Sequence, residues 1–287
     1  MDVRILALLA SFIPALLWLW FFYSRDRYEH EPKRLIGKLF LWGLLSGPWA
    51  AGLNELLSGL MGPAVNAAGR SGAISTAIGL LAAMVLLLAL NEETMKYLVT
   101  NNSTRSDPNF NERVDGMVYM TTAALGFAAG ENFIYIINSF VGTLKQAAGD
   151  GAVPAGAVTQ AFITAFAVVA PLRALLSTTG HVAWSGIVGY FLAQRVLGGR
   201  SARAVTGGVL LAGLMHTSFN FPQFLQSGLD PKGGFLSPFF LVAVLVWAVS
   251  VALYIVLFRR SLAASPFRSK QIAPGTAPAE PAKPSSP

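Results

Sequence analysis

The sequence contains no cysteine and few charged residues, and both absences limit the classes of protein to consider. Without cysteine there is no disulfide bond, no thiolate metal site and no cysteine nucleophile. Charged residues make up 12% of the 287 positions and hydrophobic residues 54%, a balance that ordinary soluble domains of this size do not show. We therefore expect the lipid bilayer as the main environment, and any chemistry must come from oxygen and imidazole groups.

The net charge of +7 does not indicate a nucleic-acid partner. The basic residues gather in short loops between apolar runs, whereas a protein that binds nucleic acid presents a basic stripe or patch on one surface. Short basic loops are typical of membrane proteins, in which they set the orientation of the helices. We therefore expect no nucleic-acid partner.

Long hydrophobic runs predict an all-α fold, a polytopic bundle of transmembrane helices with about seven to eight membrane segments. Each run is close to the roughly 20 residues that cross a hydrocarbon core of about 30 Å. The segments lie near residues 3–23, 35–61, 73–99, 114–139, 157–177, 179–197, 204–225 and 234–258.

Basic residues follow the first, third and last segments, and such loops are expected on the cytoplasmic side. If 157–177 and 179–197 were both full crossings, Arg195, Arg200 and Arg203 would lie outside. We therefore predict that 157–197 crosses only once in total, with an interfacial or re-entrant part around Pro171 and Gly180. The expected location is a bacterial cytoplasmic membrane.

The chain divides into a membrane domain and a tail. Residues 1–263 form the predicted integral membrane domain, and the polar residues of interest lie in its part from about 90 to 222. Residues 264–287 are rich in Pro, Ala and Ser, a composition that buries too little apolar area to offset the entropy of ordering the chain. We expect a disordered cytoplasmic tail.

Glu92, Glu93 and Lys96 follow an apolar run in the third segment. A charged side chain within a membrane costs on the order of 2.5–3.5 kcal/mol, so each is a candidate functional residue. On a helix the three lie on one side, with the lysine between the two carboxylates. They form either an acid–base cluster, in which one carboxylate is a general base, or a solvated helix end with a Glu–Lys pair.

Glu131 lies inside the fourth segment, directly after Gly126 and Gly130 and before Asn132. Small residues four apart allow a neighbouring helix to approach closely. A carboxylate beside such a contact can be shared between two helices, so we include Glu131 among the candidate catalytic residues.

Two of the three histidines, His181 and His216, also lie in predicted segments. Each could be a hydrogen-bonding residue between helices. His216 and Asn220 share a helical face, where an imidazole and an amide could stabilise an oxyanion. The rival role is metal binding, with His181, His216 and Glu131 as zinc ligands.

These residues together resemble the PrsW family of intramembrane proteases, which is related to the CAAX prenyl proteases and bacteriocin-immunity membrane proteins. The resemblance covers roughly residues 90–222, and four motifs on successive segments carry it. They are Glu92-Glu93-xx-Lys96, Phe127-xxx-Glu131-Asn132, His181 and His216-xxx-Asn220.

The resemblance implies a membrane-embedded peptidase of the glutamic or metallo type that cleaves single-pass membrane proteins, such as an anti-sigma factor. Carried over to this sequence, Glu92 or Glu93 activates water, His181 assists or binds metal, and His216 with Asn220 forms the oxyanion site. Lys96 has a supporting role. Zinc is the candidate cofactor, but the sequence has no His-Glu-xx-His pair, so we favour a metal-independent glutamate mechanism.

Three other functions remain open from the sequence. Intramembrane Glu and His residues also build proton relays in transporters, although no inverted repeat is visible. The polar residues could only join helices in a scaffold protein. A CAAX-type prenyl protease is the third alternative.

Overall fold

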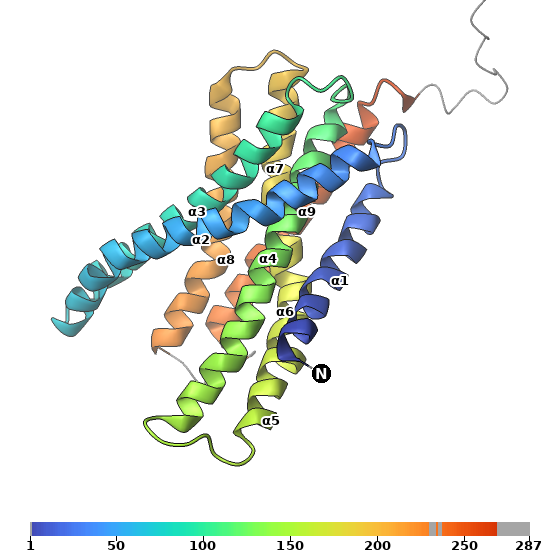
Figure 1. Ribbon diagram of the computed structural model, residues 1–287. Helices are drawn as coiled ribbons and strands as arrows, with labels where there is room; N and C mark the ends of the chain where they lie inside the picture. The colour runs from blue at the N-terminus through green and yellow to red at the C-terminus, as the bar shows by residue number, and fades with distance from the viewer. Residues whose placement is uncertain (1, 230–233, 235–236, 269–287) are drawn as a thin grey trace, which may run out of the picture.

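The computed structural model describes residues 2–229, 234 and 237–268. In these residues it shows a bundle of long helices and no β-strand. The C-terminal tail predicted to be disordered lies almost entirely outside the described residues, so that prediction stays untested. The helices α1 (Val3–Tyr23), α4 (Arg113–Ala148), α7 (Thr178–Val196), α8 (Ala202–Leu229) and α9 (Pro238–Ala263) run up and down the bundle (Figure 1).

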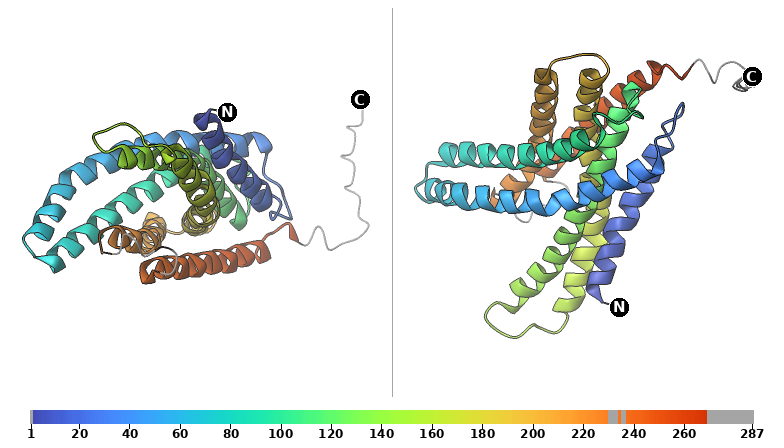
Figure 2. Two further views of the ribbon diagram at one scale, coloured as in Figure 1. Left: turned by 90° about the horizontal axis from the view of Figure 1, so that it is seen from below. Right: turned by 45° about the horizontal axis from the view of Figure 1, so that its top comes forward.

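The two remaining long helices, α2 (Lys33–Arg70) and α3 (Ile74–Thr104), form a hairpin that crosses the others at a steep angle (Figure 2, right). Every buried residue of α2 lies between 35 and 50. The buried residues of α3 all lie between 84 and 104. Only the base of the hairpin is therefore enclosed by the bundle, and its far half projects from it.

Among the described residues, five helices are long and apolar enough to cross a membrane, and α2 and α8 do not meet that criterion. The sequence predicted about seven to eight segments, and the described part of the chain has seven long helical units because 157–177 and 179–197 are joined. The two runs form one continuous helix, Ala157–Val196. Its parts are α5 (Ala157–Phe162), η1 (Ile163–Val169), α6 (Ala170–Leu172), η2 (Arg173–Ser177) and α7.

The single helix agrees with the predicted single crossing, but the predicted re-entrant part is wrong. Pro171 lies between the π-helical stretches η1 and η2, and Gly180 lies inside α7. The wider turns of a π-helix change the backbone hydrogen-bond pattern without ending the helix. The chain therefore passes Pro171 without turning back.

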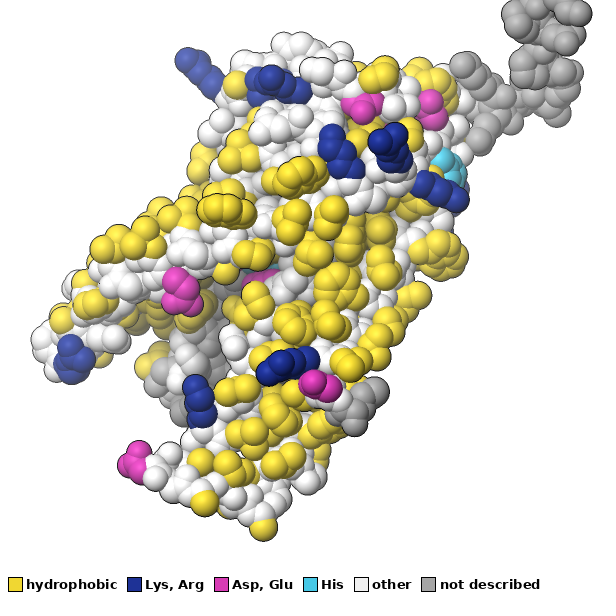
Figure 3. All heavy atoms as spheres, viewed as in Figure 1, with side chains coloured by type: hydrophobic (Ala, Val, Ile, Leu, Met, Phe, Trp, Pro, Cys, Tyr) yellow, Lys and Arg dark blue, Asp and Glu magenta, His cyan; other side chains and the backbone are white. Residues whose placement is uncertain are grey.

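The basic segments all reach one end of the bundle. The loops α1–α2, α3–α4 and α7–α8 and the end of α9 lie together at the top of Figure 1. Lys and Arg side chains gather at that end of the visible face, above a broad hydrophobic surface (Figure 3). This arrangement fits the charge rule for membrane orientation, and we refer to it as the basic end.

Close glycine contacts hold the bundle together. A Cβ atom added at Gly126 of α4 would collide with the Phe40 carbonyl of α2, and one at Gly189 of α7 would collide with the backbone of Gly116. In lipid such close packing drives helix association, because the bilayer supplies no hydrophobic driving force. Contacts of this kind were expected from the sequence at Gly126 and Gly130 and are confirmed there, and the structure shows them also at Gly186, Gly189 and Gly213.

Candidate active site

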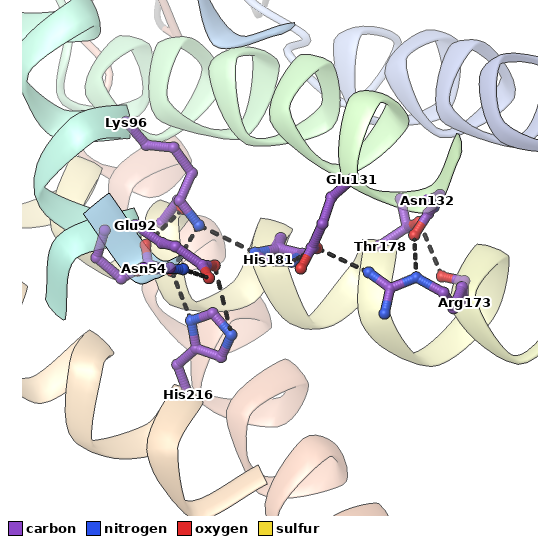
Figure 4. Close-up of polar contacts among 11 residues, drawn as sticks. Asn54, Glu92, Lys96, Glu131, Asn132, Arg173, Thr178, His181 and His216 are labelled. Atoms are coloured by element: carbon purple, nitrogen blue, oxygen red, sulfur yellow. Dashed lines mark hydrogen bonds and ion pairs between the residues drawn. The ribbon is translucent and has the colours of Figure 1, made fainter. Parts of the chain in front are cut away.

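A cavity of about 530 Å³ lies between the hairpin base, α4, α7, α8 and α9. Polar side chains line one part of it and apolar side chains the rest. The structure brings almost all of the predicted site residues to this place (Figure 4). The lining includes Asn54, Glu92, Glu131, Arg173, His181, His216 and Asn220.

Glu93 lies beside the cavity, is fully buried and has hydrogen-bond partners on both oxygens. Oε1 accepts from Lys96 Nζ at 2.6 Å and faces His216 Nδ1 at 3.2 Å, and Oε2 accepts from Ser185 Oγ at 2.7 Å. An ionised carboxylate only accepts hydrogen bonds, so the proton of His216 must lie on Nδ1. Glu93 therefore leaves His216 Nε2 unprotonated in the neutral imidazole.

Lys96 forms an ion pair with Glu93. Its ammonium group donates to Glu93 and also reaches His181 Nδ1 at 3.0 Å. Because an ammonium group is only a donor, His181 Nδ1 accepts and the ring proton lies on Nε2. His181 Nε2 then donates to Glu131 Oε2 at 2.9 Å.

Glu131 is also held by Arg173, whose Nη2 lies 2.7 Å from Glu131 Oε2. The same guanidinium donates from Nε to Asn132 Oδ1 at 2.8 Å, and Asn132 Nδ2 donates to Thr178 at 2.9 Å. Sequence reasoning missed Arg173. The rule that selected Glu131, a charged residue within an apolar run, also applies to an arginine two residues after Pro171.

Glu92 differs from Glu93, because only one of its oxygens has a hydrogen-bond partner. Oε1 accepts from Asn54 Nδ2 at 3.0 Å, and Asn91 in turn donates to Asn54 Oδ1 at 2.8 Å. Oε2 is buried with no hydrogen-bond partner and lies 3.9 Å from His216 Nε2. Asn54 and Asn91 were not predicted as site residues, although both are amides within apolar runs.

The His216 ring is fixed by a stack on Trp184, with ring centroids 4.1 Å apart and planes 14° apart. Asn220, one turn further along α8, lines the same cavity. His216 thus presents Nε2 to the cavity from a rigid position. Since that nitrogen carries no proton in the neutral ring, the geometry favours Asn220 over His216 as an oxyanion donor.

Glu92, His181 and His216 can offer three ligand atoms that lie within 4.8 Å of one another, the one such group among the described residues. Two carry free lone pairs, Glu92 Oε2 and His216 Nε2, and the Nδ1 of His216 is oriented by a carboxylate, as in most metal-binding histidines. Two imidazoles and a glutamate also match a known catalytic zinc set. The donor types therefore fit zinc, with Glu92 in the position that the sequence interpretation gave to Glu131, but both ring nitrogens of His181 are engaged by Lys96 and Glu131.

A helical membrane bundle with carboxylates and imidazoles around an internal cavity has the groups that a membrane-embedded hydrolase needs. The chain belongs to the PrsW family of intramembrane metalloproteases, whose family model matches residues 31–254. It is thus an intramembrane protease, and the comparisons give no support to the transporter or prenyl-protease alternatives.

Individual relatives agree with this assignment. The chain is 26% identical to Protease PrsW of Bacillus subtilis (strain 168) over 214 residues, 74% of this chain and 80% of the relative. It is 25% identical to Protease PrsW of Geobacillus kaustophilus (strain HTA426) over 77% of this chain and 76% of the relative. Protease PrsW of Clostridioides difficile (strain 630) is 25% identical over 76% and 79%. No solved structure matches the chain.

Proposed function

We propose that Glu92 activates water for peptide hydrolysis in the cavity, with His216 beside it. The observation that carries this proposal is the pair of groups without hydrogen-bond partners, Glu92 Oε2 and His216 Nε2, which lie 3.9 Å apart on residues that line the cavity. Both oxygens of Glu93 are engaged, and Glu131 is held through Oε2 by Arg173 and His181. Glu92 Oε2 faces His216 Nε2 without a hydrogen-bond partner, and we assign it as the oxygen that receives a proton from water or binds a metal.

The surrounding residues orient this pair. Glu93 fixes the tautomer of His216, Lys96 joins Glu93 to His181, and Arg173 holds Glu131 against His181. Such preorganised charges lower the cost of developing charge during reaction, because they need no rearrangement. Asn220, which lines the same cavity, is our candidate donor to the oxyanion of the tetrahedral intermediate.

The metal that the family description implies would be held by Glu92, His181 and His216. A bound zinc ion would supply Lewis acidity, which lowers the pKa of water and polarises the peptide carbonyl. His181 would take part only after one of its ring nitrogens was released from Lys96 or Glu131. In the absence of metal, Glu92 Oε2 is the general base.

The substrate is a single-pass membrane protein, and the resemblance to the family makes an anti-sigma factor the first candidate. The apolar part of the cavity wall, with Leu88, Phe219 and Phe224, suits hydrophobic residues next to the scissile bond. The expected location is the bacterial cytoplasmic membrane.

The decisive experiment compares wild type and Glu92→Gln for cleavage of a panel of single-pass membrane proteins after purification in detergent. We expect a loss of about 10³-fold or more, as for removal of a general base. Glu55→Gln is the matched control, because Glu55 lines the same cavity but is exposed. Full activity of Glu92→Gln would contradict the proposal.

The same preparations distinguish the two roles of Glu92. Elemental analysis should find about one zinc per chain in the wild type if a metal is bound, and much less in Glu92→Gln and His216→Ala. Cleavage that survives a chelator, with no zinc in the active protein, would establish Glu92 as a general base. Equal zinc in wild type and both variants would exclude this metal site.

A further inference from the structure

A second cavity, of about 760 Å³, lies on the other side of α7 from the active site, between α1 and α9. Helix α1 packs mainly on α4, and α9 packs on α7 and α8, so a groove remains between α1 and α9. Its lining combines aromatic and aliphatic side chains with four arginines. The apolar part includes Trp18, Phe22, Leu175, Val251, Trp247 and Tyr254.

The arginines of the groove are Arg25, Arg27, Arg259 and Arg268, and all four are exposed. They come from the loop after α1 and from the end of α9 and the residues after it, so they lie together at the basic end of the bundle. Asp26 lies between Arg25 and Arg27, but its side chain is buried. Burial and the charges of Glu112 and Asp115 raise the pKa of Asp26 to about 8, so at neutral pH it offsets little of the positive charge.

The groove walls are held in place without a ligand. The Trp18 indole donates to the Ala174 carbonyl at 3.0 Å, and the Trp247 indole donates to Thr179 Oγ1 at 2.8 Å. Phe22 and Tyr254 make an edge-to-face contact at 5.7 Å between α1 and α9. A preformed pocket binds more tightly than a mobile one, since less entropy is lost on binding.

We propose that this groove binds an anionic phospholipid, with the phosphate-containing headgroup at the four arginines and the acyl chains along the aromatic walls. Basic pockets between membrane helices are typical headgroup sites, and the apolar groove continues from the basic end into the bundle. A helix with side chains is about 10 Å across, so the cavity volume would hold fewer than about two turns of one. Flexible acyl chains fit this space better than a substrate helix does.

The test uses the full-length protein, purified in detergent, stripped of lipid and titrated with dioleoylphosphatidylglycerol or dioleoylphosphatidylcholine. Bound lipid is counted by native mass spectrometry. We expect the anionic lipid to bind at least tenfold more tightly than the zwitterionic one. Equal affinity for the two lipids would overturn the proposal.

Two pairs of variants locate the site. Arg25→Gln/Arg259→Gln should weaken phosphatidylglycerol binding on the order of 20-fold. Arg105→Gln/Arg203→Gln removes the same charge from exposed positions at the basic end outside the groove and should change affinity less than twofold. Equal losses in both pairs would show general surface attraction and overturn the groove site.

A steric pair tests the apolar half. Val251→Trp fills the groove and should abolish tight phosphatidylglycerol binding, whereas Val249→Trp, at an exposed position outside the lining, should not. Full displacement of the lipid by a single-span substrate peptide that cross-links to Val251→Cys would make the groove a substrate-docking surface and overturn the lipid assignment.

Discussion

The protein buries carboxylates in two regions, and the two regions compensate for the buried charge differently. Around the cavity, Glu93 and Glu131 are each paired with a cation, Lys96 or Arg173, and with a histidine. At the basic end, Asp26, Glu31, Glu112 and Asp115 lie buried near one another. The first arrangement preserves negative charge, and the second suppresses it.

The loop carboxyls show this suppression directly. Burial raises the pKa of Glu31 to about 9, against the lowering effect of a hydrogen bond from the Tyr119 hydroxyl. Burial and neighbouring carboxylates raise that of Asp26 to about 8. A catalytic centre needs charged groups of fixed geometry, whereas a structural junction can bury neutral acids at lower cost. The pairing of Glu93 and Glu131 with cations thus agrees with a catalytic role.

Glu93→Gln should give the largest effect, because it breaks the pairing that distinguishes the two regions. It leaves Lys96 buried without its carboxylate partner, and breaking such a pair costs about 3–5 kcal/mol. We expect lower abundance, a lower unfolding temperature and loss of cleavage. Cleavage of a reporter substrate and thermal unfolding in detergent measure these effects.

The double variant Glu93→Gln/Lys96→Met separates stability from catalysis. Removing both partners avoids an unpaired buried charge and should restore much of the lost stability. Activity should stay low, because His216 and His181 lose the partners that fix their tautomers. If cleavage recovered together with stability, the Glu93–Lys96 pair would have a structural role and no catalytic one.

Arg173→Met should have an intermediate effect. The Arg173 and Glu131 side chains are 16% and 20% exposed, so the pair is mostly buried, and its loss should cost stability but less than the roughly 3–5 kcal/mol of a fully buried pair. Cleavage should fall about tenfold, mainly in kcat, because Glu131 would orient His181 less well. Arg173→Lys keeps the charge and should therefore recover part of the cleavage activity. An unchanged kcat in Arg173→Met would exclude a positioning role for Arg173.

The sequence predicted the helical class and the residues around the cavity because charged side chains within apolar runs are conspicuous at any position. It did not predict which carboxylate, Glu92 or Glu93, has an oxygen without a hydrogen-bond partner. Glu92 and Glu93 are neighbours on one helix, and their difference arises from Asn54 on α2 and Ser185 on α7. Partners distant in sequence leave no local pattern. The steep crossing of the α2–α3 hairpin was missed for the same reason.

Asp26→Asn should have the smallest effect and one confined to the basic end. A carboxyl group with a raised pKa favours the folded state at low pH, and this contribution is lost as the pH rises from about 4 towards 8. The wild-type unfolding temperature should therefore fall between pH 6 and pH 9, and Asp26→Asn, which cannot ionise, should lessen that fall. Near pH 4 and below, where Asp26 is largely neutral in both the folded and the unfolded state, the variant and the wild type should unfold at similar temperatures, and at neutral pH they should cleave substrate equally. If the variant lost as much stability with rising pH as the wild type, Asp26 would already be ionised at neutral pH. The contrast between charged carboxylates around the cavity and neutral carboxyl groups at the basic end would then not include Asp26.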